Sequence, residues 1–338
     1  MWWWILNKLR IFLLVVLCAC FLCGCSNDSE DEIVKNIKKN LKDMSSYQVE
    51  GNLTIYNDNN QYDYNVNVFY EEDEKYRVNL TNVLNNHEQI ILKNSNEVYV
   101  ITPSLNKSFK FQSSWPKDSS QIYLIESLYE DIFISENRMF EKVDSGYVFK
   151  IEANYPNNSN LVKQTIEFDN NLKLINVKVY DDNDVLQMNM DFKNIVINEN
   201  IDDDVFDLDA IIKGTDVNSN DKEVSSIDDI IYPLYIPNGT VLIEEEKVSK
   251  DDGERIILTF DGEKPFILVE ETISVGDDFS IIPTFGEPFF MFDSVATLSD
   301  NSISWISDGI EYYLISDVMS QIELIEIASS VTTIEYDK

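Results

Sequence analysis

The chain has almost none of the residues that usually carry catalysis. All four cysteines lie at or before Cys25, and His87 is the single histidine. Thiol catalysis and a cysteine metal site in the body of the protein are therefore excluded, and one histidine in an asparagine-rich turn is more typical of a surface than of a general base. With ten glycines in 338 residues, the chain has neither a Gly-x-Ser-x-Gly elbow nor a glycine-rich phosphate loop. These absences predict a protein that is not an enzyme and uses no cofactor.

Positive charge is also scarce. The sequence has 26 Lys and Arg against 61 Asp and Glu, a formal net charge of −35. Such a surface disfavours nucleic acid and anionic lipid headgroups, and it favours neutral, cationic or apolar partners. With so many acids, carboxylate pairs suited to glycoside hydrolysis arise by chance. The runs Asp181–Asp184 and Asp202–Asp204 lack calcium-loop spacing, so we interpret them as solvated turns and predict no metal site.

The most specific pattern lies near the N-terminus. Lys8 and Arg10 precede an apolar run of 14 residues, Ile11–Gly24, and this is the layout of a secretory signal. An uncleaved transmembrane anchor is the less favoured alternative, because a span needs roughly 20 apolar residues. The run ends in a bacterial lipobox, a branched apolar residue and two small residues followed by cysteine. Its members are Leu22, Cys23, Gly24 and Cys25.

We therefore predict cleavage between Gly24 and Cys25 and attachment of a diacylglyceryl group to the Cys25 thiol. Two acyl chains anchor a protein stably, whereas one chain holds it only reversibly. The processed chain would have 24 Lys and Arg against 61 Asp and Glu, a formal charge of −37, and no cysteine left for a disulfide. These features predict a lipid-anchored protein on the extracytoplasmic face of the cell membrane.

Composition divides the rest of the chain. Residues 211–228 are polar, have few large apolar side chains and show no periodicity, as is typical of linkers. The expected segments are a signal peptide (1–24), a lipidated tether (25–29), an N-terminal domain (30–210), the linker (211–228) and a C-terminal domain (229–338).

The N-terminal domain combines helical and strand periodicities. A capping-box pattern, Ser29-x-x-Glu32, opens a helix, and a second helix is expected over 119–132, after Trp115-Pro116. The runs with a period of two predict successive antiparallel hairpins. The expected strands are 47–55, 62–70, 76–80, 88–93, 97–102, 107–112, 147–154, 163–169, 172–180 and 185–197.

This order of elements resembles the LolA/LolB/RseB group of lipoprotein-carrier folds. The stretch Val98–Phe111, continued by Trp115-Pro116 and Tyr123-Leu124, is similar to Firmicute sporulation and germination lipoproteins of the GerS type. The resemblance implies an α+β fold in which an antiparallel sheet forms an open half-barrel with covering helices and an apolar concave face. It also implies a role in making or opening the spore envelope, by binding a cortex-modifying N-acetylmuramoyl-L-alanine amidase. A lipid-anchored chain departs from the soluble carriers, because it cannot shuttle freely between membranes.

The C-terminal domain is predicted to be a smaller α+β domain of antiparallel hairpins with a C-terminal helix. Runs 240–248 and 255–260 form one hairpin, and Asp308-Gly309 is a two-residue turn between 303–307 and 310–315. Ser320-x-x-Glu323 opens the final helix. The pattern resembles an uncharacterised domain that often follows LolA-like domains, which leaves its role open.

Two groups of apolar residues are candidates for a binding surface. Trp115, Ile122, Ile125 and Tyr129 lie where the resemblance places the cover of a cavity, although the favoured interpretation is that they simply pack as core. A second group surrounds Pro288, and it is core unless it is exposed, in which case it marks a partner surface. Its members are Phe285, Phe289, Phe290, Met291 and Phe292.

Two functions are compatible with these patterns. The first is a non-enzymatic scaffold on the membrane that binds an envelope protein such as the amidase. The alternative is a carrier or receiver that holds lipid or lipoprotein acyl chains in the cavity of the half-barrel.

Overall fold

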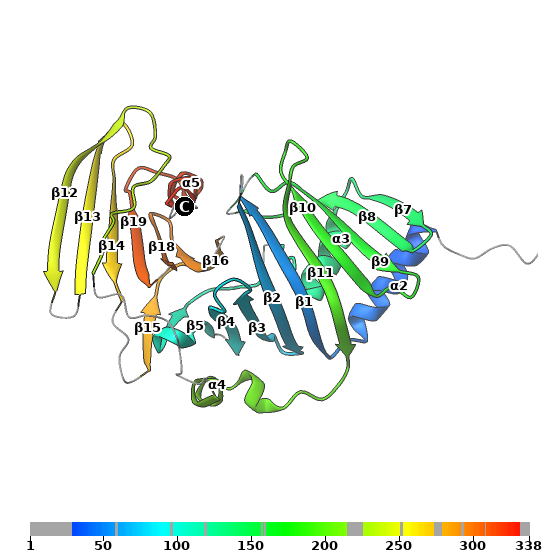
Figure 1. Cartoon of the computed structure of the whole chain (residues 1–338). Helices are drawn as coiled ribbons and strands as arrows, with labels where there is room; N and C mark the ends of the chain where they lie inside the picture. The colour runs from blue at the N-terminus through cyan, green and yellow to red at the C-terminus, as the bar shows by residue number, and fades with distance from the viewer. Residues whose placement is uncertain are drawn as a thin grey trace, which may run out of the picture.

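The computed structural model describes residues 29–57, 60–94, 97–117, 120–156, 158, 160–214, 226–250, 253–273, 279–291, 294–307 and 309–331. Within them the chain forms an α+β fold with two large sheets and covering helices (Figure 1), which confirms the expected class. The signal segment with its lipobox, Leu22–Cys25, lies outside the described residues. None of the described helices combines the length and the apolar character that a bilayer-spanning segment requires.

The first sheet has twelve strands in the order β15-β6-β5-β4-β3-β2-β1-β11-β10-β9-β8-β7. The pairings recorded between neighbouring strands are antiparallel, except that β15 runs parallel to β6. Its strands are β1 (Ser46–Asn57), β2 (Asn60–Glu71), β3 (Lys75–Asn82), β4 (Glu88–Asn94), β5 (Glu97–Thr102), β6 (Lys107–Phe111), β7 (Met139–Val143), β8 (Gly146–Glu152), β9 (Lys163–Asp169), β10 (Leu174–Tyr180), β11 (Leu186–Ile197) and β15 (Ser280–Thr284).

Alternation of apolar and polar side chains explains why these segments form a sheet with one buried face. In β1 the side chains of Tyr47, Val49 and Leu53 are almost completely buried, whereas Glu50 between them is exposed. Successive side chains of a strand point to opposite faces, so these apolar residues lie together on one side. That side faces the helices and carries the main core.

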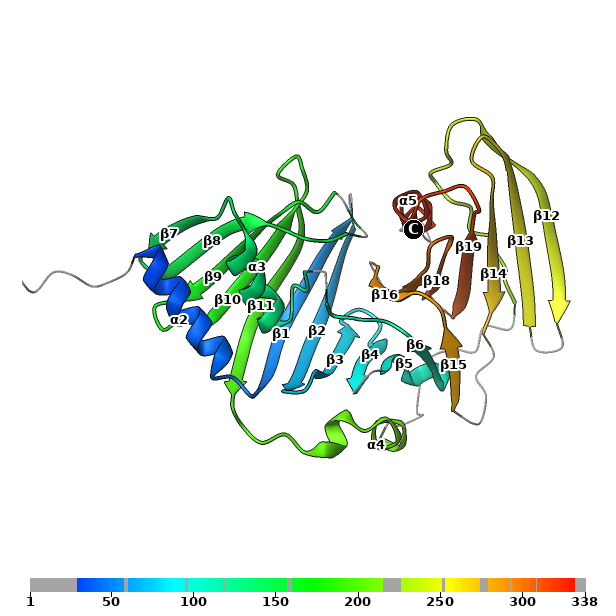
Figure 2. The same cartoon turned by 180° about the vertical axis from the view of Figure 1, so that it is seen from behind.

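Two helices cover this face, α2 (Glu30–Lys42) and α3 (Ile125–Ile134). Figure 2 shows both helices in front of the strands. Ile37 of α2 and Leu128 and Ile132 of α3 are fully buried in the same apolar cluster as the sheet residues. The helices therefore close the sheet by the hydrophobic packing of their inner faces.

Two expectations about these helices were wrong in detail. Ser29 is the N-cap of α2, but its side chain makes no capping hydrogen bond, and the backbone carbonyl of Ser29 accepts from the N–H of Glu32 instead. The middle helix begins at Ile125 rather than 119, because the backbone N–H of Gln121 is bound to the Ser127 hydroxyl in a turn that precedes the helix.

The segment after β11 returns along the opposite face of the first sheet. It contains the 3-10 turn η2 (Asp203–Phe206) and the short helix α4 (Leu208–Gly214). Phe206 and Ile211 bury their side chains there. They form a second, smaller cluster with Ile90, Leu92, Tyr99 and Ile101.

The second sheet has seven strands in the order β12-β13-β14-β19-β18-β17-β16. The helix α5 (Gln321–Ser329) packs on it through Leu324 and Ile327. The expected capping box of this helix is confirmed, since Ser320 and Glu323 bind each other's backbone N–H groups. The strands are β12 (Thr240–Lys250), β13 (Gly253–Gly262), β14 (Phe266–Thr272), β16 (Glu287–Phe290), β17 (Val295–Leu298), β18 (Ser302–Ser307) and β19 (Ile310–Ile315).

We call the part built on the first sheet the first lobe and the part built on the second sheet the second lobe. Strand β15 belongs by sequence to the expected C-terminal domain, yet it extends the first sheet by pairing with β6. The backbone N–H of Val295 in β17 also donates a buried 2.6 Å hydrogen bond to Gln89 Oε1 in β4. Strand β15 and Val295 thus join the two lobes.

Candidate functional site

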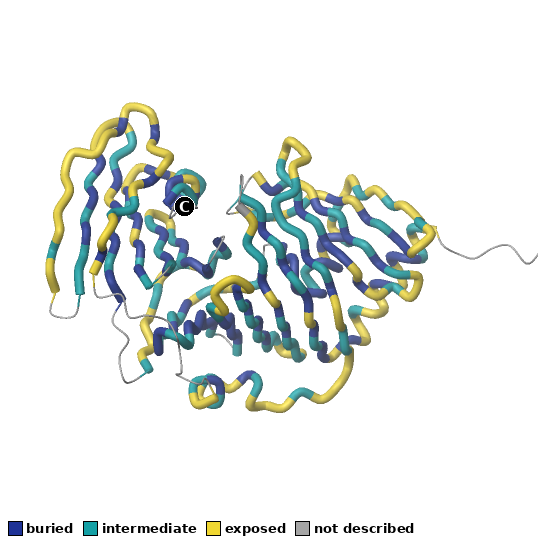
Figure 3. Tube along the Cα trace, viewed as in Figure 1, coloured by how far each residue is buried: buried dark blue, intermediate teal, exposed yellow. Residues whose placement is uncertain are grey.

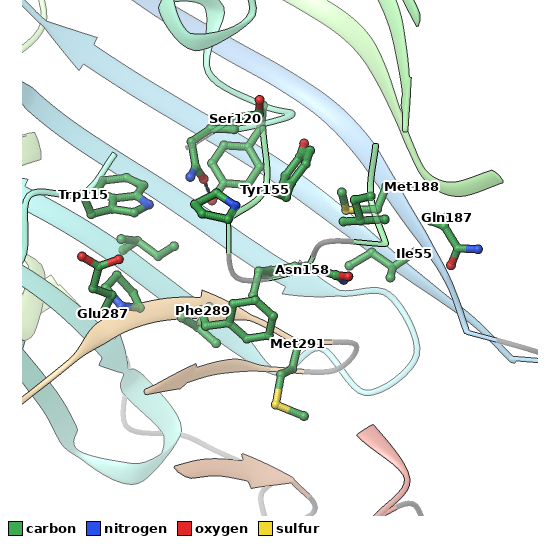
Figure 4. A pocket seen from close by; sticks show the side chains of 18 of the residues that line it. Ile55, Trp115, Ser120, Tyr155, Asn158, Gln187, Met188, Glu287, Phe289 and Met291 are labelled. Atoms are coloured by element: carbon green, nitrogen blue, oxygen red, sulfur yellow. Dashed lines mark hydrogen bonds between the residues drawn. The ribbon is translucent and has the colours of Figure 1, made fainter. Parts of the chain in front are cut away.

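An apolar pocket of about 140 Å³ lies where the lobes meet (Figure 4). Its walls come from the ends of β1 and β11, the segment before α3, the loop after β8, and β16 of the second lobe. The apolar lining includes Ile55, Met188, Trp115, Tyr155, Phe289 and Phe290. Because these residues come from distant parts of the sequence, only the folded chain assembles the pocket.

Aromatic contacts hold two of these walls. The ring of Trp115 packs edge-on against Tyr76 of β3, with 5.9 Å between centroids. Phe290 makes a similar contact across the lobes with Tyr64 of β2, at 5.5 Å. Each edge-to-face pair of this kind adds roughly 0.5–1.5 kcal/mol of stability beyond what the burial of the apolar ring surface contributes. The pocket is therefore bounded by fixed rings that extend from both lobes.

Tyr155 lines the pocket, and its hydroxyl is buried in the wall. No hydrogen-bond partner for the hydroxyl exists among the described residues. Burial raises the pKa of Tyr155, and the nearby Asp131 and Tyr123 raise it further. The phenol thus stays protonated at neutral pH.

Behind this wall lies a buried polar network. Gln164 Nε2 donates to Asp131 Oδ2 at 2.6 Å, and the Ser120 hydroxyl accepts from the backbone N–H of Asn154 at 2.9 Å. Burial raises the pKa of Asp131 to about 6, while the bonds from Gln164 and Ser120 oppose that rise. Because these bonds join α3 and β9 to the segment around Ser120, they fix the backbone that lines the pocket.

The structure brings some of the predicted residues to the pocket and leaves others in the core. Trp115 lines the pocket, whereas Ile122, Ile125 and Tyr129 are buried in the main core of the first lobe. Their role as the cover of a ligand cavity stays a prediction.

The second predicted group is divided in the same way. Phe289, Phe290 and Met291 line the pocket, while Phe285 projects from the surface with 84% of its area exposed. Phe292 lies outside the described residues. Sequence reasoning did not find Tyr155 or Met188, because neither belongs to a motif and only the fold brings them to the pocket.

The site offers binding surface rather than a set of reactive groups. No group of three or more metal-ligating side chains occurs within the described ranges. His87 lies in the turn between β3 and β4, with its Nδ1 3.5 Å from the Ser104 hydroxyl, and it is not part of the pocket lining. The arrangement can accept an apolar group.

Comparison with known proteins identifies the family. Residues 6–206 match the family model described as sporulation protein YdcC-like. The chain is also 34% identical over 318 residues to the sporulation protein YdcC of Bacillus subtilis (strain 168), which covers 93% of this chain and 94% of that protein. The chain therefore belongs to the YdcC-like sporulation proteins. This confirms the kinship with sporulation proteins that the sequence pattern indicated.

Solved structures give more distant similarities. A complex of MucA and MucB from Pseudomonas aeruginosa matches at 12% identity, over 88% of this chain and 98% of the other, with a TM-score of 0.33. The complex of the CwlD amidase with the GerS lipoprotein from Clostridioides difficile matches at 12% identity over 53% and 98%, with a TM-score of 0.28. A LolA superfamily protein from Nitrosomonas europaea matches at 13% identity over 53% and 97%, with a TM-score of 0.31.

Proposed function

We propose that this sporulation-related protein is a lipoprotein anchored on the extracytoplasmic face of the cell membrane, where it binds another envelope protein without catalysing a reaction. The observation that carries the binding role is the pocket between the lobes. Its volume of about 140 Å³ is below the roughly 300–1,000 Å³ of sites that enclose a small-molecule ligand. It suits the insertion of an apolar side chain from a partner, as at the centres of protein interfaces. The lipobox ending at Cys25 supports the anchor.

The partner we propose is a cortex-modifying N-acetylmuramoyl-L-alanine amidase. This choice follows from the resemblance of Val98–Phe111 to lipoproteins of the GerS type. The acidic surface, with a net charge of −35, favours a partner whose contact surface is neutral, cationic or apolar.

The test is a binding measurement between the full-length protein in detergent and the amidase of the same organism. Phe289→Ala removes a pocket wall, and we expect it to weaken binding at least tenfold, as a central aromatic residue of an interface does. Leu84→Ala is the control, because Leu84 is exposed in the turn between β3 and β4 and does not line the pocket. Absence of binding by the wild-type protein, or equal weakening by both variants, would contradict the proposal.

The carrier function remains the second candidate, because the lining of the pocket is mostly apolar. Native mass spectrometry of protein extracted from membranes of sporulating cells separates the two functions. A lipid bound beyond the covalent anchor, and lost in Met188→Arg, would support the carrier. Protein without such a lipid that still captures the amidase supports the scaffold.

A further inference from the structure

Strand β12 forms an open edge of the second sheet. It pairs with β13 on one side and ends the strand order of that sheet. Figure 1 places it at the outer edge of the second lobe, far from the first lobe, and Figure 3 shows its tube exposed along almost the whole length. Residues 241–247 are all exposed. An edge of this kind leaves backbone N–H and C=O groups open to pairing with another chain.

Part of this edge is regular enough to accept a strand. The pairing with β13 is interrupted by a bulge between Leu242 and Glu244, and from Glu244 to Lys250 it continues without a shift. Bulges disrupt pairing locally. The segment Glu244–Lys250, which we call the open edge, is therefore the part with an unbroken pattern of outward backbone groups. In an antiparallel pair these groups alternate along the strand.

The charges of the open edge that have no ion pair among the described residues are all negative. Glu244, Glu245 and Glu246 are consecutive and exposed, and no ion pair to them is found in the described part of the chain. The two cations of the open edge already have carboxylate partners. Lys247 binds Glu254 at 2.8 Å, and Lys250 binds Glu271.

The alternation of side chains along a strand determines which partner sequence would complement these glutamates. Side chains of a strand alternate between faces, so Glu244 and Glu246 share one face of the sheet. A chain added at the edge would place side chains directly opposite them, about two residues apart. Opposite charges in such cross-strand positions stabilise pairing, and like charges oppose it.

We propose that the open edge binds an extended segment of a partner protein that has lysine or arginine at alternate positions. The segment adds an eighth strand to the second sheet and gains specificity from Glu244 and Glu246. A second copy of this chain is a poor occupant, because it brings the same glutamates and a net charge of −35 to the contact. The amidase proposal does not depend on this edge, since the pocket is formed elsewhere.

The probe is a nine-residue peptide of alternating lysine and threonine, titrated into the full-length protein in detergent at low salt. We expect binding that protects the backbone amides of residues 244–250 from hydrogen exchange. The same peptide N-methylated at every residue keeps its charges and loses its donors, so it should not bind. Glu246→Lys should weaken binding roughly five- to tenfold, because it replaces an attraction with a repulsion.

Glu50→Lys is the matched control for the charge change. Glu50 is an exposed glutamate too, but it lies in β1 between β2 and β11 and has no open edge. We expect this variant to bind the peptide like the wild-type protein. Binding of the N-methylated peptide, equal weakening by the two variants, or no binding by the wild-type protein would overturn the proposal. So would equal binding of a glutamate-threonine peptide, which would show pairing without charge selection.

A failed capture of the amidase leaves this peptide assay unaffected, and a failed peptide assay leaves the pocket test unaffected. The two results are therefore distinguishable.

Discussion

The Tyr47 hydroxyl on β1 donates a 2.6 Å hydrogen bond to Glu126 Oε2 on α3, and it thereby ties the covering helix to the sheet. The second carboxyl oxygen of Glu126 is buried and has no partner among the described residues. Burial raises the pKa of Glu126 to about 7, while the bond from Tyr47 opposes that rise. The hydrogen bond that holds α3 to the sheet therefore involves a carboxyl group whose burial favours its protonated, neutral form.

This relationship predicts a stability that falls as the pH rises. The pKa of Glu126 in the folded protein, about 7, lies above its ordinary value of 4.5, so the folded state holds the proton more tightly than the unfolded state. The contribution is complete below about pH 4.5 and is lost as the pH rises through 7. Glu126→Gln should therefore raise the free energy of unfolding by about 1–3 kcal/mol at pH 8 and change it little at pH 5. Urea denaturation at the two pH values measures this difference.

Tyr47→Phe provides the companion measurement for the same bond. It leaves the Glu126 carboxyl without its donor, and the loss should cost about 1–3 kcal/mol at pH 8. A Glu126→Gln variant with the same pH dependence as the wild-type protein would show that Glu126 does not titrate in this window. Glu270 of the second lobe also has a pKa raised by burial, to about 7, so it contributes to the pH dependence of the wild-type protein in the same range. The difference between the wild-type protein and the Glu126→Gln variant isolates the contribution of Glu126.

Gly51 is predicted to be essential for the pairing of β1 with β11. The register of these strands shifts between Glu50 and Gly51, and a Cβ at Gly51 would lie 2.5 Å from the backbone oxygen of Asp191. Gly51→Ala must therefore displace backbone, and we expect a loss of about 1–3 kcal/mol in unfolding free energy. Gly214→Ala is the control, because nothing lies within 4 Å of its new methyl group. Equal unfolding midpoints for the two variants would refute the close approach.

The sequence was sufficient to predict elements that depend on local pattern. The alternation at Tyr47, Val49 and Leu53 predicted β1, because a period of two is a property of the segment itself. The capping box at Ser320 and Glu323 was also confirmed. The similar pattern at Ser29 did not form a box, since its side chain makes no capping bond.

Features that depend on tertiary contacts were not predicted. Strands β15 and β16 are only five and four residues long, and each contains a proline, Pro283 and Pro288, which weakens a strand pattern. The parallel pairing of β15 with β6 has no local signal at all. Trp115 was singled out as a candidate site residue because the family resemblance placed a cavity cover there, whereas Tyr155 and Met188 belong to no motif and reach the pocket only through the fold.

The junction of the lobes predicts a specific effect of Gln89. Its Oε1 accepts the buried N–H of Val295, so Gln89→Ala leaves that donor without a partner, at a cost of about 1–3 kcal/mol. We expect faster hydrogen exchange at the Val295 amide together with a lower unfolding midpoint. Gln61→Ala is the control, since Gln61 is exposed on β2 and its removal should change stability by less than about 0.5 kcal/mol. Unchanged exchange at Val295 would show that this bond does not hold the lobes together.

The proposed lipid anchor predicts where the protein is found in the cell. In Cys25→Ala the thiol that would receive the diacylglyceryl group is absent, so the protein should either leave the membrane fraction or keep its signal segment uncleaved. Cys18→Ala removes a thiol from the apolar run without altering the lipobox, and it should fractionate and mature like the wild-type protein. Membrane fractionation with intact-mass analysis of the N-terminus measures both properties. A Cys25→Ala protein that is cleaved at position 25 and still sediments with membranes would mean that something other than an acyl group holds it there.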